Sequence, residues 1–137
     1  MKTLLKFMPL FISTAALFAQ SSPADRILGI WSTPKQESAV QIVKCGDAYC
    51  GSIQSMTTPR NDEHNADPSL RSRPLVGAQI MTGFQYAGSN TWNGGALYAP
   101  RSGKNISPDI VLTTPDSLDI KVKKGLMSKS LTWKREK

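Results

Sequence analysis

Short runs of alternating apolar and polar residues, separated by turn residues, recur along most of this chain. The alternation is clearest near the C-terminus, where the apolar positions are Leu118, Ile120 and Val122 and the residues between them are charged. Successive side chains of a strand point to opposite faces of a sheet, so this period of two predicts a strand with one buried and one solvated face. Leu131 and Trp133 repeat the pattern in a final strand.

Eight segments of this kind predict strands, and no segment has the apolar period of an amphipathic helix. They cover residues 29–33, 38–45, 50–57, 79–86, 92–98, 105–113, 118–123 and 131–134. Each lies close to the next in sequence, which favours antiparallel neighbours joined by short turns. Closing eight strands into a ring removes the exposed edges that otherwise aggregate. The expected fold is therefore all-β, an eight-stranded antiparallel up-and-down barrel, with a two-sheet sandwich as the alternative.

Three interruptions of the strand pattern carry further predictions. Gly94-Gly95 falls inside the fifth strand and indicates a bulge or a close approach of backbone, because glycine weakens a plain strand. Pro108 interrupts the sixth strand. Residues 58–74 are the longest stretch without a strand pattern, and within it Asp67 as N-cap and Pro68 at the first position predict a single helical turn. A loop of this length in a compact domain is usually functional or disordered.

The first residues have the layout of a secretory signal peptide. A basic start is followed by an apolar run from Phe7 to Phe18 and then by Ala19, a small residue after which cleavage is expected, with Ala24 as the second choice. The run is shorter than the roughly 20 apolar residues that cross a bilayer, which disfavours a membrane anchor. Cleavage separates a signal peptide at residues 1–19 from a single domain at residues 20–137. We expect that domain to be periplasmic or secreted and to contain no transmembrane segment.

The two cysteines, Cys45 and Cys50, predict a disulfide, because an even cysteine count in an exported protein is typical of a bridge. Their spacing suits a hairpin in which the residues flanking a four-residue turn face each other. Facing pairs lie roughly 4.5–5.5 Å apart, which a disulfide can span. A redox pair normally lies on a helix at a closer spacing, and zinc would need two further ligands where only His64 is present. Both are weaker alternatives.

The chain is basic, with a formal net charge of +7 that becomes +5 when Lys2 and Lys6 leave with the signal peptide. The excess is concentrated at the end, where seven Lys or Arg residues occur from Lys121 onward against the single carboxylate of Glu136. Such a surface attracts an anionic envelope component, such as lipid, polysaccharide or acidic protein, or it is a solvated face that keeps a strand soluble. Nucleic acid is a poor candidate partner for an exported protein.

Catalytic chemistry has little support in the sequence. His64, the only histidine, lies in an acidic segment that lacks the alternate oxygen ligands and the central glycine of a calcium loop. No nucleophile elbow, Cys–His signature or phosphate-binding glycine loop is present. We therefore expect no enzyme, no metal and no cofactor. A hydrolase or isomerase that uses loop carboxylates is the least favoured interpretation.

Two sets of side chains are candidate ligand contacts. In an extended segment Arg71 and Arg73 point the same way and could grip a carboxylate or phosphate. The alternative is that they pair with carboxylates of the 58–74 loop and pin that loop to the barrel. Eight-stranded barrels are either filled by side chains or just wide enough for one small ligand. The aromatic candidates for lining such a pocket are Phe84, Tyr86, Trp92 and Tyr98.

Several of these segments occur together in one order. They are Gly29-Ile30-Trp31, Cys45-Gly46 to Cys50-Gly51, Leu70-Arg71-Ser72-Arg73-Pro74-Leu75-Val76-Gly77, Trp92-Asn93-Gly94-Gly95, Leu97-Tyr98 with Gly103-Lys104, and Trp133-Lys134-Arg135. Over nearly all of its mature part the chain resembles a family of small exported bacterial proteins catalogued as a domain of unknown function with a lipocalin-like fold. The stretch from Leu70 to Gly77 is the most specific part. The chain departs from the family at Ala99, where an aspartate is usual, and at Asn105 and Ile106, where an aromatic is common.

This resemblance implies a lipocalin- or calycin-like barrel, in which the Trp of Gly-x-Trp closes the floor and an Arg of the last strand packs across its ring. Trp31 and Arg135 are in position for these structural roles. The leading hypothesis is an exported, non-catalytic binding protein for a small, largely apolar molecule such as a lipid or fatty acid. The alternative is an envelope or secreted protein-interaction or inhibitor module that acts through the 58–74 loop and the basic C-terminal strands.

Overall fold

The structure is a computed structural model that describes residues 8–10 and 22–137. The predicted signal peptide and its cleavage point after Ala19 lie outside the described residues, apart from residues 8–10. Within the described ranges, no helix is long and apolar enough to cross a membrane. The helical elements there are three short 3-10 turns, η1 (Pro23–Ile27), η2 (Pro34–Gln36) and η3 (Pro68–Leu70).

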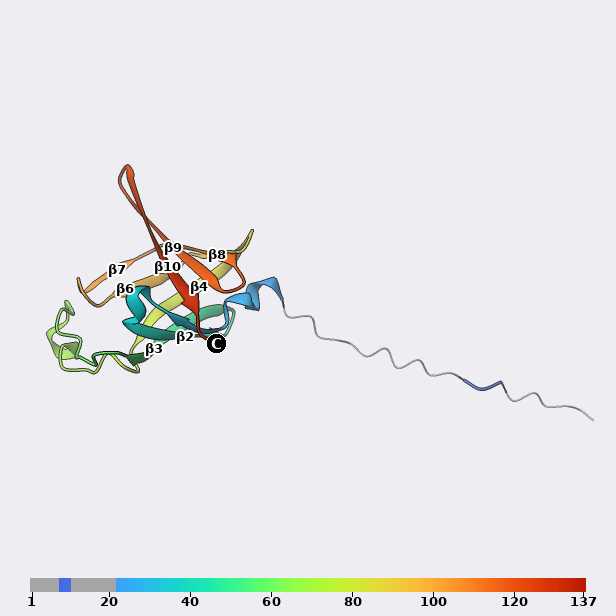
Figure 1. Cartoon of the computed structure of the whole chain (residues 1–137), viewed down its shortest axis with the longest axis horizontal. Coiled ribbons are helices and arrows are strands. Elements are labelled where there is room, and N and C mark those ends of the chain that lie inside the picture. The colour runs from blue at the N-terminus through green and yellow to red at the C-terminus, as the bar shows by residue number, and fades with distance from the viewer. Residues whose placement is uncertain (1–7, 11–21) are drawn as a thin grey trace, which may run out of the picture.

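Ten strands form one antiparallel sheet that closes into a barrel (Figure 1). In chain order they are β1 (Gly29–Ser32), β2 (Ser38–Cys45), β3 (Ala48–Met56), β4 (Gln79–Gly88), β5 (Thr91–Asn93), β6 (Ala96–Ala99), β7 (Lys104–Ile106), β8 (Asp109–Thr114), β9 (Ser117–Lys124) and β10 (Met127–Arg135). From β1, pairing runs through β2, β3 and β4 on one side and through β10, β9 and β8 on the other. The pairing of β5 with both β4 and β8 closes the ring.

The ten strands correspond to eight barrel strands, two of which are interrupted. β4 pairs first with β6 and then with β5, so β5 and β6 are one strand broken at Gly94-Gly95. β6 pairs with β7 and β5 with β8, which makes β7 and β8 one strand broken at Pro108. Gly95 leaves no room for a side chain, because a Cβ atom there would lie 2.4 Å from the Thr82 carbonyl oxygen. The predicted eight-stranded up-and-down barrel is confirmed, and both predicted interruptions are present.

Apolar side chains fill the inside of the barrel. Its largest fully buried residues are Trp31 of β1, Phe84 of β4 and Trp92 of β5. Leu118 and Ile120 of β9 are also fully buried, as their alternation with charged residues predicts. Side chains of this size each contribute roughly 1.5–3 kcal/mol when they leave water, so the filled interior is the main source of stability.

The β3–β4 loop contains the predicted single helical turn, η3. Asp67 is its N-cap and accepts a hydrogen bond from the Ser69 amide at 3.0 Å, and Pro68 occupies its first position. The loop packs closely against the barrel. Leu75 joins the core, and a Cβ atom at Gly103 would lie 1.7 Å from the backbone oxygen of a loop residue.

One end of the barrel, the closed end, is covered by η1. The Trp31 indole donates a hydrogen bond to the Ile27 carbonyl oxygen at 2.9 Å, and the Trp92 indole donates to the Ala24 carbonyl oxygen at 3.1 Å. Two core tryptophans from different strands therefore hold η1 across the barrel end, and their own N–H groups are satisfied by the same contacts.

Arg135, the last residue of β10, lies across the Trp31 ring, with its guanidinium carbon 4.2 Å from the ring centroid. Its Nη1 donates to the Leu28 carbonyl oxygen at 2.7 Å and its Nη2 to the Arg26 carbonyl oxygen at 2.7 Å. This is the arrangement that the lipocalin resemblance implies. Gly29 makes room for it, because its φ is +132° and a Cβ atom there would lie 2.6 Å from Nη1.

The Cys45–Cys50 disulfide lies at the closed end, in the β2–β3 hairpin, with the two Cα atoms 6.0 Å apart. The predicted four-residue turn with facing cysteines is wrong in detail. The turn has two residues, so Cys45 pairs with Ala48 and Cys50 pairs with Val43. The cysteines are diagonal neighbours because Gly46, with φ +62°, lets the chain reverse immediately after β2.

Replacing Arg135 by alanine is expected to lower the free energy of unfolding by about 3 kcal/mol. The variant loses the cation–π contact with Trp31 and leaves three carbonyl groups, those of Arg26, Leu28 and Pro115, without a donor. Lysine should recover less than half of this loss, because an ammonium group cannot reproduce the guanidinium fork. Urea unfolding followed by tryptophan fluorescence measures both variants.

Arg101→Ala is the control for the arginine series. Arg101 forms an ion pair with Glu37 on the surface, and its loss should cost at most about 1 kcal/mol. Equal losses in the two alanine variants would contradict the role given to Arg135.

Candidate functional site

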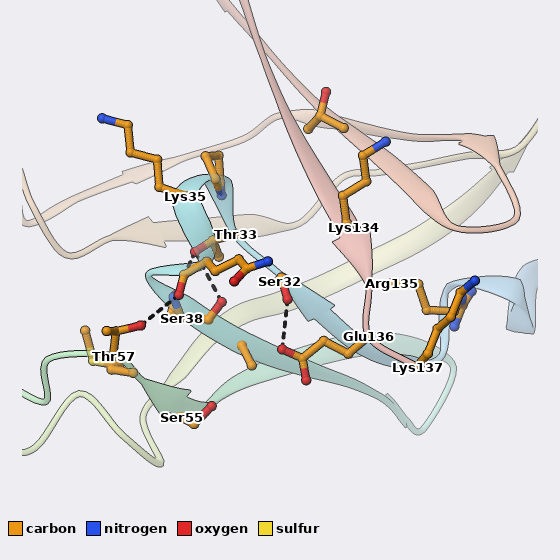
Figure 2. A pocket seen from close by; sticks show the side chains of 15 residues that line it. Ser32, Thr33, Lys35, Ser38, Ser55, Thr57, Lys134, Arg135, Glu136 and Lys137 are labelled. Carbon is orange, nitrogen blue, oxygen red and sulfur yellow. Dashed lines mark hydrogen bonds between the residues drawn. The ribbon is translucent and has the colours of Figure 1, made fainter.

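A polar groove of about 730 Å³ lies between the β1–β2 connection and the end of β10 (Figure 2). Ser32 and Lys134 are among the residues that line it. They alternate with the buried Trp31 and Trp133, which places the groove on the outer surface of the barrel.

Several polar side chains of this groove are already hydrogen-bonded. Ser32 donates to the Glu136 carboxylate at 2.8 Å, and the Thr33 and Ser38 hydroxyl oxygens lie 3.0 Å apart (Figure 2). Thr57 donates to a backbone oxygen of η2 at 2.8 Å. Groups that are already satisfied offer few free donors or acceptors to a ligand, so the polar groove is the weaker candidate.

The barrel wall opens beside β9 and β10. Pairing between β8 and β9 ends at Lys121, and pairing between β1 and β10 includes only the last two residues of β10, Lys134 and Arg135. β9 and β10 nevertheless remain paired with each other up to their connecting turn. Residues 122–132 therefore form a two-stranded extension beyond the barrel, here called the projecting hairpin (Figure 1).

A second hollow, here called the apolar groove, is lined by the projecting hairpin and by residues of and next to β7, and has a volume of about 810 Å³. Its apolar lining side chains are Ile106, Val122, Met127 and Leu131. Its cationic lining side chains are Lys104, Lys123, Lys124 and Lys129. Asn105, Ser107 and Ser128 complete the lining, so none of the described residues that line it is acidic.

The apolar groove continues the inner face of the barrel. Leu131 is two residues from the buried Trp133, and Val122 is two residues from the buried Ile120. Because side chains alternate along a strand, Leu131 and Val122 face the same way as the core. Ile106 of β7 packs against the core from the opposite wall. The groove is therefore the mouth of the barrel, opened where β7 and β9 separate.

The lining of the apolar groove suits an amphipathic anion. Aliphatic side chains can cover a hydrocarbon chain, and lysine ammonium groups can pair with a carboxylate or phosphate at the rim. Among the described residues, no group of three or more His, Cys, Asp or Glu side chains comes together that could hold a metal ion.

The predicted arginine pair lies elsewhere, in the β3–β4 loop. Arg73 pairs with the buried Asp62, with Nη2 2.9 Å from the carboxylate and Nε donating to it at 3.0 Å. Tyr98 of β6 donates to the same carboxylate at 2.5 Å, and the Asn65 side chain donates at 2.8 Å. Arg71 donates to the Asn65 carbonyl oxygen at 2.8 Å. These contacts fasten the loop to β6.

The network also fixes the ionisation of its members. Burial acts to raise the pKa of Asp62, but hydrogen bonds from Tyr98, Asn65 and Arg73 outweigh burial and hold that pKa below its usual value. Burial, and after it the hydrogen bond to Asp62, raises the pKa of Tyr98 to about 12. At neutral pH a carboxylate therefore accepts from a neutral phenol, which is the state that strengthens their hydrogen bond.

The predicted aromatic candidates lie in the core or pack beside it. Phe84 and Trp92 are fully buried in the core, and Tyr86 packs on Trp92 with ring centroids 5.0 Å apart. Tyr98 packs beside the core and binds the loop carboxylate. None of these four residues, and neither arginine of the predicted pair, lines the apolar groove. Their role as ligand contacts stays a prediction.

Comparison with known proteins places the chain in a family. Residues 29–135 match the family described as "Uncharacterized protein conserved in bacteria (DUF2147)". The chain belongs to the DUF2147 family. The resemblance predicted from the sequence motifs is thereby confirmed. A search of curated protein sequences found no match to this DUF2147 chain.

Among solved structures, this DUF2147 protein is similar to HP1028 of Helicobacter pylori, which is described as belonging to the lipocalin family. The TM-score is 0.71, and the alignment covers 80% of this chain and 82% of the other at 23% sequence identity. A likeness at this identity shows the fold alone. The barrel is lipocalin-like, as the sequence predicted.

Sequence reasoning missed the residues that line the apolar groove of this DUF2147 protein. The alternation places Val122 and Leu131 on strands, but it does not reveal that β8 and β1 stop short of them. One signal was present. Past the last core positions, the inward-facing side becomes a mixture of apolar and basic residues, with Lys124, Met127 and Lys129 on it.

Asp62→Asn is expected to lower the free energy of unfolding by about 3 kcal/mol at neutral pH, because Arg73 and Tyr98 lose a charged acceptor. The lowered pKa of Asp62 stabilises the fold above the unfolded-state value of about 3.9, and this contribution is lost as the pH falls through the folded-state pKa. The variant should therefore lose stability less steeply in acid than the parent. Urea unfolding over a pH series measures both effects.

Asp47→Asn is the control for the acid series, because Asp47 is exposed in the β2–β3 turn. It should leave both stability and acid dependence nearly unchanged. If the free energy of unfolding of Asp62→Asn fell with pH as steeply as that of the parent, the Asp62 carboxylate would not be the group that makes stability depend on pH.

Proposed function

We propose that this protein is an exported, non-catalytic binding protein for a small, largely apolar ligand that carries an anionic group. A fatty acid or a related lipid has this chemistry. The observation that carries the proposal is the apolar groove at the mouth of a lipocalin-like barrel, with four apolar and four lysine side chains in its lining.

The size of the groove fits such a ligand. Sites for small molecules usually have volumes of roughly 300–1,000 Å³ and are lined by apolar side chains with a few polar groups that fix orientation. The groove volume of about 810 Å³ lies inside this range. Because the interior below Leu131 is filled by the core, the ligand would lie in the mouth and not deep in the barrel.

An exported location supports the same proposal. The Cys45–Cys50 disulfide forms and persists in oxidising compartments, which include the bacterial periplasm and the cell exterior. The predicted signal peptide would bring the chain there. A carrier in that compartment would meet lipids released from the envelope.

The alternative is a protein-interaction or inhibitor module that acts through the 58–74 loop and the basic C-terminal strands. Its motivation is the lysine-rich projecting hairpin. The loop contributes less, because Arg73 is engaged by Asp62 and Arg71 by a backbone oxygen of the loop itself.

Native mass spectrometry of the protein purified from its own host distinguishes the two functions. A carrier should show a discrete added mass that is lost on denaturation and that solvent extraction identifies as a small amphipathic molecule. A bare polypeptide mass, together with failure to take up added fatty acid, would remove the basis for the carrier and favour the interaction module.

Leu131→Ser is expected to weaken binding of a long-chain fatty acid roughly tenfold, because it removes apolar surface from the groove wall. Titration of a fluorescent fatty acid and its displacement by the unlabelled acid measure the change. Leu70→Ser is the matched control, since Leu70 is 36% exposed and Leu131 is 37% exposed, but Leu70 lies in η3, away from the groove lining. Equal weakening in both variants would argue against the groove as the site.

A further inference from the structure

The tip of the projecting hairpin combines exposed apolar side chains with a high density of positive charge. Leu126 is fully exposed and Met127 is 78% exposed. Three lysines of the hairpin flank them, a fourth lies at its base where β9 still pairs with β8, and residues 121–131 contain no acidic side chain. These lysines are Lys121, Lys123, Lys124 and Lys129, all of them exposed.

The hairpin presents this tip away from the rest of the molecule. Beyond Lys121 on β9, and before Lys134 on β10, neither strand pairs with a neighbour other than its hairpin partner in the described part of the chain. The hairpin rises clear of the barrel in Figure 1. Lysines along such free strand edges oppose pairing with a strand of another chain, so a partner that adds a β-strand is disfavoured.

We propose that the projecting hairpin docks the protein onto a bilayer surface that contains anionic lipid. Leu126 and Met127 enter the headgroup boundary, and Lys123, Lys124 and Lys129 lie among the negatively charged headgroups. Such a surface matches the tip in both respects. Its boundary accepts apolar side chains, and its negative potential attracts basic segments that stand within a Debye length.

An acidic protein partner fits the tip less well than a membrane. It would satisfy the lysines but would leave the protruding Leu126, which is surrounded by basic residues, without an apolar counterpart unless it offered a matching pocket. A bilayer needs no such pocket. The proposal does not rest on the carrier function, although the apolar groove opens beside the same hairpin and a docked protein would hold its mouth against the membrane.

Flotation with lipid vesicles tests the docking. The processed protein, as its host exports it, is mixed with vesicles of phosphatidylglycerol and phosphatidylcholine in equal parts and with vesicles of phosphatidylcholine alone. We expect the protein to float with the mixed vesicles, to float much less with the neutral ones, and to be released as salt is raised.

Two substitutions separate docking from ligand binding, because neither Leu126 nor Lys121 lines the apolar groove. Leu126→Ser should lower vesicle partitioning roughly tenfold, through the lost apolar side chain. Lys121→Gln should lower it by less than the roughly fivefold effect of a charge at the surface, because Lys121 stands at the base of the hairpin. Both variants should bind a fluorescent fatty acid as the parent does, so a failure of docking and a failure of the carrier function give different results.

Val43→Ser with Lys44→Gln is the matched control. Val43 is 41% exposed and the Lys44 side chain 55% exposed, and both lie at the closed end, next to the β2–β3 turn. This pair removes one apolar side chain and one charge while leaving the hairpin intact, so vesicle binding should persist. The proposal would be overturned by equal losses in the control, by binding that ignores anionic lipid, or by a hairpin that instead mediates self-association.

Discussion

The packing of the Arg135 guanidinium on the Trp31 indole is the contact on which the closed barrel depends. β1 and β10 share only two register pairs, so backbone hydrogen bonds alone join the first and last strands weakly. Arg135 adds a cation over an aromatic face and two charged hydrogen bonds to the backbone around η1. Gly29 has no side chain, which leaves room for the Arg135 guanidinium to lie against the backbone there. The Arg135 side chain thus links the β1–β10 pairing, where the barrel closes, to η1 at the closed end.

The two ends of the barrel differ in role. The closed end contributes stabilising contacts, and the mouth holds the apolar groove. At the closed end, η1 is held by two tryptophan N–H groups and by the Arg135 fork, and the adjacent hairpin carries the disulfide. At the mouth, β9 and β10 leave their neighbours, and apolar positions that would otherwise be core become the lining of a groove. A well-anchored floor lets the opposite end stay open without loss of the fold, because most of the buried apolar surface lies below it.

The sequence predicted the strands well because their information is local. The period of two in β9, the Gly94-Gly95 break and the Asp67–Pro68 turn each follow from neighbouring residues, and each is present. The mouth was not predictable in this way, since it depends on where β7 and β8 stop relative to β9. Likewise, Asp62 binds Arg73 from the same loop and Tyr98 from a distant strand. No spacing in the sequence indicates the contact between Asp62 and Tyr98.

The pairing of β1 with β10 also sets the order in which the chain can fold. Trp31 and Arg135 stand near opposite ends of the barrel sequence, so the ring has no complete floor until its last strand is available. During synthesis, the earlier hairpins can form locally, but the chain stays an open sheet until residue 135 has emerged. Closure is then a late event between segments far apart in sequence, the slow kind of step in β proteins. A protein built in this way becomes compact only when its last strand has been made and can pair with the first.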